Sequence, residues 1–209
     1  MKKTFLAGIT TTLLVLMTVS TGFSEKIHLI DKGAEWNYTA IENDLWADWT
    51  AAGHDSFEWD TAEWMTGNAA FGNVVSPSYP HPFNTYWAAN TDLALQKTVD
   101  VNGYIDLPVR MKIASDNGVI VFVNGTEVFK VNEEGYTDYW EYVVALSPEL
   151  FVTGANLIQV LAEDHGGITF FDMKLTALVE PIPTPEPATM FLLGSGLLGL
   201  AGARARKKK

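Results

Sequence analysis

Four residues in the first third of the chain have the side chains that proteins use to bind sugars. Trp59 and Trp64 lie five positions apart, and Asp60 and Glu63 lie between them. An indole face can stack on the C–H face of a pyranose, and carboxylates can accept hydrogen bonds from its hydroxyl groups. The pattern predicts a candidate ligand-binding site at these four residues. In the alternative interpretation, the tryptophans pack in and around the core of the domain.

A second group of polar residues could hold a cation. Asp116 and Asn117 precede a glycine, and Asp164 opens the sequence Asp-His-Gly-Gly. Carboxylate and amide oxygens are suitable ligands for calcium, which takes six to eight oxygens. These three residues therefore form a candidate metal site for a structural calcium ion. The alternative is that they only stabilise tight turns through hydrogen bonds to the nearby backbone, in which case no cofactor is needed.

The sequence contains no established catalytic motif. There is no His-Glu-x-x-His pair, phosphate-binding loop, dinucleotide fingerprint or Gly-x-Ser-x-Gly elbow. There is no cysteine either, which excludes disulfides, thiolate nucleophiles and cysteine-ligated zinc. Asp60 and Glu63 could act as the acid and base of a glycosidase if their carboxyl groups lay about 5–10 Å apart. We expect a protein that is not an enzyme, and the rival class is a carbohydrate-active hydrolase.

Charge limits the partners of the central part of the chain. Residues 25–180 contain seven basic and 24 acidic residues, which gives a formal net charge of −17. Such a surface repels the phosphates of nucleic acids and of anionic lipids. We therefore expect no nucleic-acid partner, whereas divalent cations and neutral glycans remain possible. At 156 residues this segment has the length of one domain.

The elements that would position the polar residues are predicted to be β-strands. Apolar and polar residues alternate over residues 107–113, which is the period of a strand with one buried face. Residues 115–118 have the composition of a turn, and residues 119–123 are apolar on both faces. Asn124 and Gly125 are the favoured pair for a type I′ turn, so a hairpin partner is expected at residues 126–131.

Further strands are expected at residues 93–101, 139–146, 157–162 and 170–179. Several short strands at intervals of about 8–12 residues, with no sustained helical period, indicate a sandwich or jelly roll. The predicted fold class is therefore all-β, with a single jelly-roll-type β-sandwich over residues 25–180. An N-terminal signal peptide and a C-terminal transmembrane sorting helix are expected to flank it.

The N-terminal segment has the pattern of an export signal. Lys2 and Lys3 precede an apolar stretch, and small residues precede Glu25. This predicts a signal peptide over residues 1–24 that the Sec machinery recognises, with an uncleaved signal anchor as the alternative. Either form sends the following domain across the inner membrane.

The C-terminal segment has three parts, each with a physical task. A proline-rich spacer over residues 181–187 keeps the chain extended. An apolar run over residues 188–203 follows, and its 16 residues are fewer than the roughly 20 that usually span a bilayer. Snorkelling and local thinning close this gap. We predict a transmembrane helix and basic cytoplasmic tail over residues 188–209, whose membrane stop is Arg204, Arg206, Lys207, Lys208 and Lys209.

Pro185, Glu186 and Pro187, followed by a Leu/Gly-rich stretch and an Arg/Lys terminus, resemble the PEP-CTERM sorting signal of exported bacterial proteins. The resemblance covers about the last 25 residues. It implies a Gram-negative host that makes exopolysaccharide and processing near the Pro-Glu-Pro by an exosortase of the inner membrane. It implies nothing about the fold of the preceding domain.

The turns around Asp116, Asn124, Asn156 and Asp164 resemble those of galactose-binding-domain-like jelly rolls over about residues 35–179. This resemblance implies sugar binding at one end of the sandwich, in some members with a structural calcium ion. Together the patterns predict a non-enzymatic exported protein of the cell surface or extracellular matrix, associated with exopolysaccharide or biofilm. A calcium-assisted, lectin-like module is the alternative within binding proteins.

Overall fold

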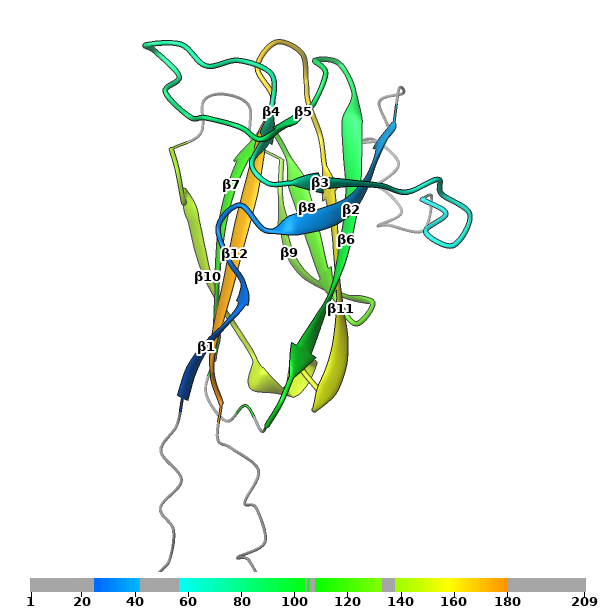
Figure 1. Cartoon of the computed structure of the whole chain (residues 1–209), viewed down its shortest axis with the longest axis vertical. Helices are drawn as coiled ribbons and strands as arrows, with labels where there is room; N and C mark the ends of the chain where they lie inside the picture. Colours follow the sequence, from blue (N-terminus) through cyan, green and yellow to red (C-terminus); the bar gives the residue numbers. More distant parts are fainter. Residues whose placement is uncertain (1–24, 42–56, 104, 106–107, 133–137, 180–209) are drawn as a thin grey trace, which may run out of the picture.

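A computed structural model of the chain describes residues 25–41, 57–103, 105, 108–132 and 138–179. These residues form two packed β-sheets and one short 3-10 helix, η1, at Pro148–Leu150 (Figure 1). The predicted all-β sandwich is therefore confirmed. Within the described residues no helix has the length and apolar character needed to cross a membrane. The predicted signal peptide, spacer and transmembrane helix lie outside the described residues.

Sheet A contains six strands in the order β10-β7-β12-β4-β5, and β1 pairs with the second half of β12. All pairs are antiparallel except the short parallel pair of β4 and β5. The strands of sheet A are β1 Glu25–Ile30, β4 Phe71–Gly72, β5 Thr85–Tyr86, β7 Val109–Asp116, β10 Tyr142–Leu146 and β12 Phe170–Val179.

Sheet B also contains six strands, in the order β3-β2-β6-β11-β8-β9, and all of its pairs are antiparallel. The hairpin of β8 and β9 turns at Asn124 and Gly125, whose φ angles of 51° and 79° are those of the predicted type I′ turn. The strands of sheet B are β2 Glu35–Ile41, β3 Met65–Asn68, β6 Asp92–Val101, β8 Val119–Val123, β9 Thr126–Val131 and β11 Gly154–Ala162.

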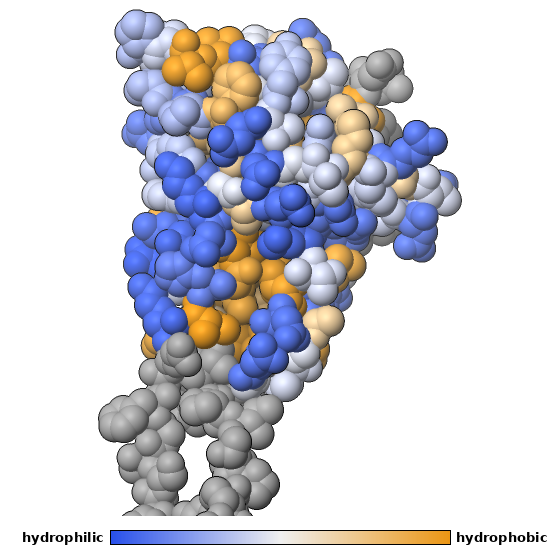
Figure 2. Space-filling view, in the orientation of Figure 1, coloured by the Kyte–Doolittle hydropathy of each residue, from blue (hydrophilic) through white to orange (hydrophobic). Residues whose placement is uncertain are grey.

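The main core lies between the two sheets and is rich in aromatic residues. Trp36 of β2 contacts Phe171 of β12 edge to face at 6.1 Å, and Tyr38 contacts Phe71 of β4 at 5.0 Å. Each ring pair therefore joins sheet B to sheet A. In the lower half of the molecule, Figure 2 shows apolar residues gathered between the sheets, with hydrophilic residues on both sides. Full burial of one such side chain contributes about 1.5–3 kcal/mol, which a domain without disulfides needs.

Both ends of the sandwich leave the molecule at the same pole. Glu25 at the start of β1 pairs with Val179 at the end of β12. Figure 1 shows these two strand ends at the bottom, next to η1. The loop between β4 and β5 and the turn between β11 and β12 lie at the opposite pole, the top of Figure 1. Any segment that follows residue 179 therefore starts from the pole opposite to these loops.

Candidate functional site

The predicted sugar-binding tryptophans lie together in an aromatic cluster formed by Phe57, Trp59 and Trp64. The two indole rings stack at 6.0 Å between centroids with an interplanar angle of 12°. Phe57 contacts both rings in an edge-to-face arrangement, with centroid distances of 4.7 Å and 6.3 Å. The cluster belongs to the connection between β2 and β3, so it lies beside sheet B rather than between the sheets.

The aromatic cluster covers apolar residues on the outer face of sheet B. Ala94, Ile120, Phe122 and Leu161 are fully buried there, and the cluster packs against them. This explains why β8 is apolar on both faces, since its other side chains enter the main core. The three aromatic side chains are only half-buried, so part of each ring stays accessible. Packing therefore accounts for one side of the cluster and leaves the other side available for a ligand.

The two carboxylates of this candidate site are exposed. Asp60 and Glu63 flank a turn in which the Thr61 hydroxyl donates a hydrogen bond to Glu58 Oε2 at 3.0 Å. The indole N–H of Trp59 is buried, and none of the described residues accepts a hydrogen bond from it. Two stacked indoles with nearby acceptors can contact a sugar. The ligand-binding role of these four residues stays a prediction.

The candidate metal residues meet at the pole opposite to Glu25 and Val179. Asp116 closes β7, and Asp164 follows β11. The turn after β7 and the segment after β11 are joined by two backbone hydrogen bonds, from Asn117 N to Glu163 O at 2.9 Å and from Glu163 N to Gly118 O at 3.0 Å. Two segments whose carboxylates are 48 positions apart in the sequence therefore meet at one end of the sandwich.

These carboxylates are buried, and this changes their acidity. Burial, followed by the negative charges of Asp164 and Glu141, raises the pKa of Asp116 to about 7. Burial also raises the pKa of Asp164, although backbone N–H groups of Asn90 and Gly166 favour its ionised form. Asp164 Oδ2 accepts the Asn90 N–H at 2.5 Å, whereas Oδ1 is buried without a hydrogen bond in the described structure.

The fit of this site to calcium is incomplete. Asn117 Oδ1 already accepts a hydrogen bond from the His165 N–H at 2.9 Å, as expected for a turn-stabilising residue. Within the described residues, no three histidine or acidic side chains come close enough to hold a metal ion. Asp164 Oδ1 is the atom that a cation would satisfy, because it is buried and has no donor. The calcium hypothesis stays a prediction.

A comparison with protein families finds the PEP-CTERM protein-sorting motif at residues 183–207. This chain carries a PEP-CTERM sorting signal. The signal makes it an exported protein that is targeted to an exosortase and processed at the membrane, with a C-terminal tail that anchors it there. The matched residues follow the sandwich and lie outside the described part of the structure.

Solved structures that resemble the sandwich have very different sequences. A β-glucuronidase from Ruminococcus gnavus is 8% identical with a TM-score of 0.46, over 77% of this chain and 30% of that one. A β-glucuronidase from an uncultured Clostridium sp. is 7% identical with a TM-score of 0.44, over 78% and 30%. The PA14 domain of the MpAFP antifreeze protein is 19% identical with a TM-score of 0.38, over 71% and 87%. No curated protein matches the sequence.

The chain spans about 30% of the length of the glucuronidases whose structures it resembles. Resemblance at this level carries no statement about a shared activity or ligand.

Sequence patterns do not predict the polar contacts on the outer face of sheet A. The Tyr139 hydroxyl donates a hydrogen bond to Asp172 Oδ2 at 2.5 Å, and burial raises the pKa of both groups. The sequence signal that could have indicated them is the alternation of apolar and polar residues in β12, where Met173 and Leu175 enter the core. This places Asp172 and Lys174 on the opposite face of the strand.

Proposed function

We propose that this PEP-CTERM protein is a non-enzymatic component of the cell surface or extracellular matrix that associates with exopolysaccharide through its β-sandwich. The observation that carries the proposal is the sorting signal at residues 183–207, directly after an all-β domain. The signal accounts for export and membrane processing. The domain is the part that stays folded outside the cell after the exosortase has processed the tail.

The position of the chain ends supports this role. The pairing of Glu25 with Val179 brings both ends of the sandwich to one pole. A tail that continues from residue 179 therefore leaves from that pole, and the loops of the other pole face away from it (Figure 1). The far pole is therefore kept clear of the attachment point.

Association with the matrix is tested by fractionating the native host. We expect the protein in the matrix fraction, and in the culture medium when the host is made unable to synthesise exopolysaccharide. The variant Trp59→Ala with Trp64→Ala tests whether the aromatic cluster contributes to retention, with the exposed Tyr86→Ala as control. Equal distribution in both hosts contradicts the proposal. Release of reducing sugars that is lost in Glu63→Gln would instead favour a carbohydrate-active hydrolase.

A calcium-assisted, lectin-like module is the second candidate function. The buried Asp164 Oδ1, which lacks a hydrogen bond in the described structure, favours it. Because a cation binds the ionised carboxylates, we expect calcium to raise the melting temperature at pH 8 and to have a smaller effect at pH 5. The shift should be lost in Asp116→Asn and should not appear with magnesium. An unchanged melting temperature at pH 8 contradicts this candidate.

A further inference from the structure

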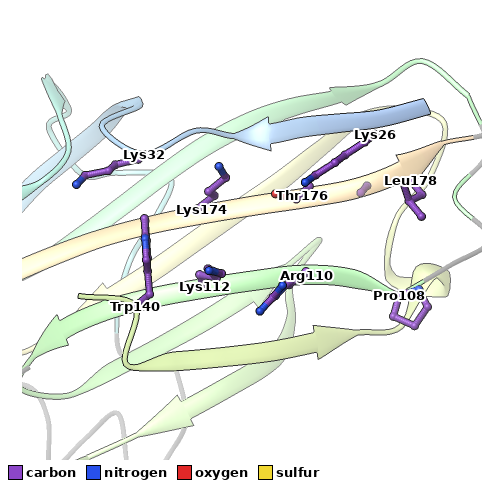
Figure 3. Close-up of a pocket in the computed structure, with 10 residues that line it drawn as sticks. Lys26, Lys32, Pro108, Arg110, Lys112, Trp140, Lys174, Thr176 and Leu178 are labelled. Carbon is purple, nitrogen blue, oxygen red and sulfur yellow. The ribbon is translucent and has the colours of Figure 1, made fainter. Parts of the chain in front are cut away.

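A groove on the outer face of sheet A gathers most of the basic residues of the sandwich. Its cavity has a volume of about 530 Å³, and no aspartate or glutamate of the described structure lines it. Five cations from three strands and one turn surround it, as Figure 3 shows: Lys26, Lys32, Arg110, Lys112 and Lys174. They are five of the seven basic residues between residues 25 and 180, in a segment of net charge −17. We call this site the basic groove.

The strand register brings like charges together in the basic groove. Lys112 of β7 is directly opposite Lys174 of β12, and Arg110 is opposite Thr176. Like charges at directly opposed positions destabilise an antiparallel pair. Among the described residues, neither lysine forms an ion pair with an acid. The arrangement therefore costs stability, and no contact within the described structure offsets it.

An aromatic ring lies at one end of the same groove. Trp140 lines the cavity and has a φ of 64°, in the left-handed region that non-glycine residues rarely adopt. Packing holds it there, because its ring contacts Tyr139 edge to face at 4.9 Å. Tyr139 is itself fixed by its hydrogen bond to Asp172 and by the Lys32 ammonium, 3.8 Å from its ring centroid. Strained residues that are fixed in this way are common at binding sites.

We propose that the basic groove binds a carboxylate-bearing polysaccharide. The inference rests on the proposed function, from which it takes the polysaccharide, and it adds the site and the chemical class of the ligand. Arg110 can hold a carboxylate with two parallel hydrogen bonds, and the lysines can hold others as point charges. Trp140 offers a ring face or edge for a pyranose.

The shape of the groove favours a polymer over a single anionic group. Figure 3 shows Pro108, Lys26 and Leu178 toward one end of it and Lys32 and Trp140 toward the other. Outward positions along a strand repeat at about 6.6 Å, so charges at intervals along a chain contact several cations at once. One lipid phosphate reaches only part of this row. Nucleic acid carries a dense charge that the acidic remainder of the domain repels.

Binding of defined ligands by the full exported protein, purified from its host in detergent, tests the inference. We expect binding to polygalacturonate, a polymer of carboxylated sugars, and little binding to its methyl ester, in which the same carboxylates are neutral. Binding should weaken as salt is added. Lys112→Gln with Lys174→Gln should weaken it about tenfold or more, which is the effect of losing one charge-assisted hydrogen bond.

A matched variant controls for the change in charge. Lys97→Gln with Lys130→Gln removes the other two basic residues of the sandwich, which lie on β6 and β9 of sheet B, and should bind as the unchanged protein does. Removing the opposed lysines of the groove should leave the melting temperature equal or higher, because it relieves their repulsion. Weaker binding together with an equal or higher melting temperature is what we expect when a binding site destabilises the fold.

Three results with the purified protein would overturn the inference. They are equal binding of the acid and its methyl ester, unchanged binding by the groove variant, and binding to phosphatidylglycerol vesicles in place of polygalacturonate. If the groove variant stays in the matrix fraction of the host as the unchanged protein does, this inference fails and the proposed function stands. If the unchanged protein is not retained by exopolysaccharide, the proposed function fails as well.

Discussion

Replacing Pro185, Glu186 and Pro187 with alanine is expected to abolish processing and to leave the protein at the membrane with its complete C-terminal tail. Prolines keep a segment extended and accessible, whereas three alanines would allow the helix predicted over residues 188–203 to continue toward the domain. We expect a complete loss of the protein from the matrix fraction, because an unprocessed tail holds it at the membrane. Intact mass and membrane fractionation of the native host measure it.

A control in the same spacer separates the motif from general stiffness. Pro181→Ala with Pro183→Ala removes two prolines that precede the Pro-Glu-Pro and should leave processing unchanged. A shortened protein from the alanine variant of residues 185–187 would show that the Pro-Glu-Pro is not required. A full-length tail on the unchanged protein would show that the signal retains the chain as an anchor.

Asp116→Asn is expected to stabilise the sandwich at pH 8, measured without calcium, and to have little effect at pH 4. The pKa of Asp116 is raised to about 7 in the folded protein, against about 3.9 in the unfolded chain. Between these values the unfolded state releases the proton that the folded state keeps. Stability therefore falls as pH rises from 4 to 7, by up to about 1.4 kcal/mol per unit and about 4 kcal/mol in all. Asparagine stays neutral and avoids this loss.

Denaturant unfolding at pH 4, 5.5 and 8 measures the effect. The unchanged protein should lose stability across this series, and the slope should be shallower in Asp116→Asn. Asp100→Asn is the matched control, because Asp100 is an exposed aspartate on β6. If the free energy of unfolding of Asp116→Asn changed with pH as steeply as that of the unchanged protein, a group other than Asp116 would be responsible for the pH dependence.

The strands of the second half of the sandwich could be predicted because each has a local signal. The alternation before residue 113 and the pair Asn124-Gly125 correspond to β7 and to the turn of the β8–β9 hairpin. Several boundaries differ: β10 begins at Tyr142 and β11 at Gly154, against 139 and 157 in the prediction, and the end of β7 differs as well. Ser115 and Asp116, predicted as turn residues, continue β7, because this strand keeps pairing with β12 as far as Asp116 and Phe170. Cross-strand hydrogen bonds decided that boundary, and they involve residues far apart in the sequence.

The strands that precede β6 could not be predicted in the same way. β1 pairs with β12, about 150 positions later, and its register shifts between His28 and Ile30, which interrupts the alternation. β4 and β5 have two residues each, too few for any period to be visible. Strand pairing also decides which tryptophans are buried, and the sequence does not contain it. Trp36 and Trp87 are buried, whereas Trp59 and Trp64 cover the outside of sheet B.

The basic groove also depends on pairing that a single sequence does not contain. Alternation indicates that Arg110, Lys112 and Lys174 share the face of their strands that points away from the core. The neighbourhood of β7 and β12, with β1 on the other side of β12, brings them to one cavity. The net charge of the domain conceals this concentration. An average over the whole segment predicted repulsion of anions, and the local arrangement predicts attraction.

The shared pole of the two chain ends has a mechanical consequence. β12 carries Lys174 in the basic groove and ends at Val179, from which the tail continues. Tension between a ligand in the groove and an anchored tail would enter sheet A through β1, β7 and β12 and would leave it along the axis of β12, whose pairs with β1 and β7 are antiparallel. Load in that direction shears many ladder hydrogen bonds together instead of opening them one after another. The strands of sheet B, which do not line the groove, would bear little of this load.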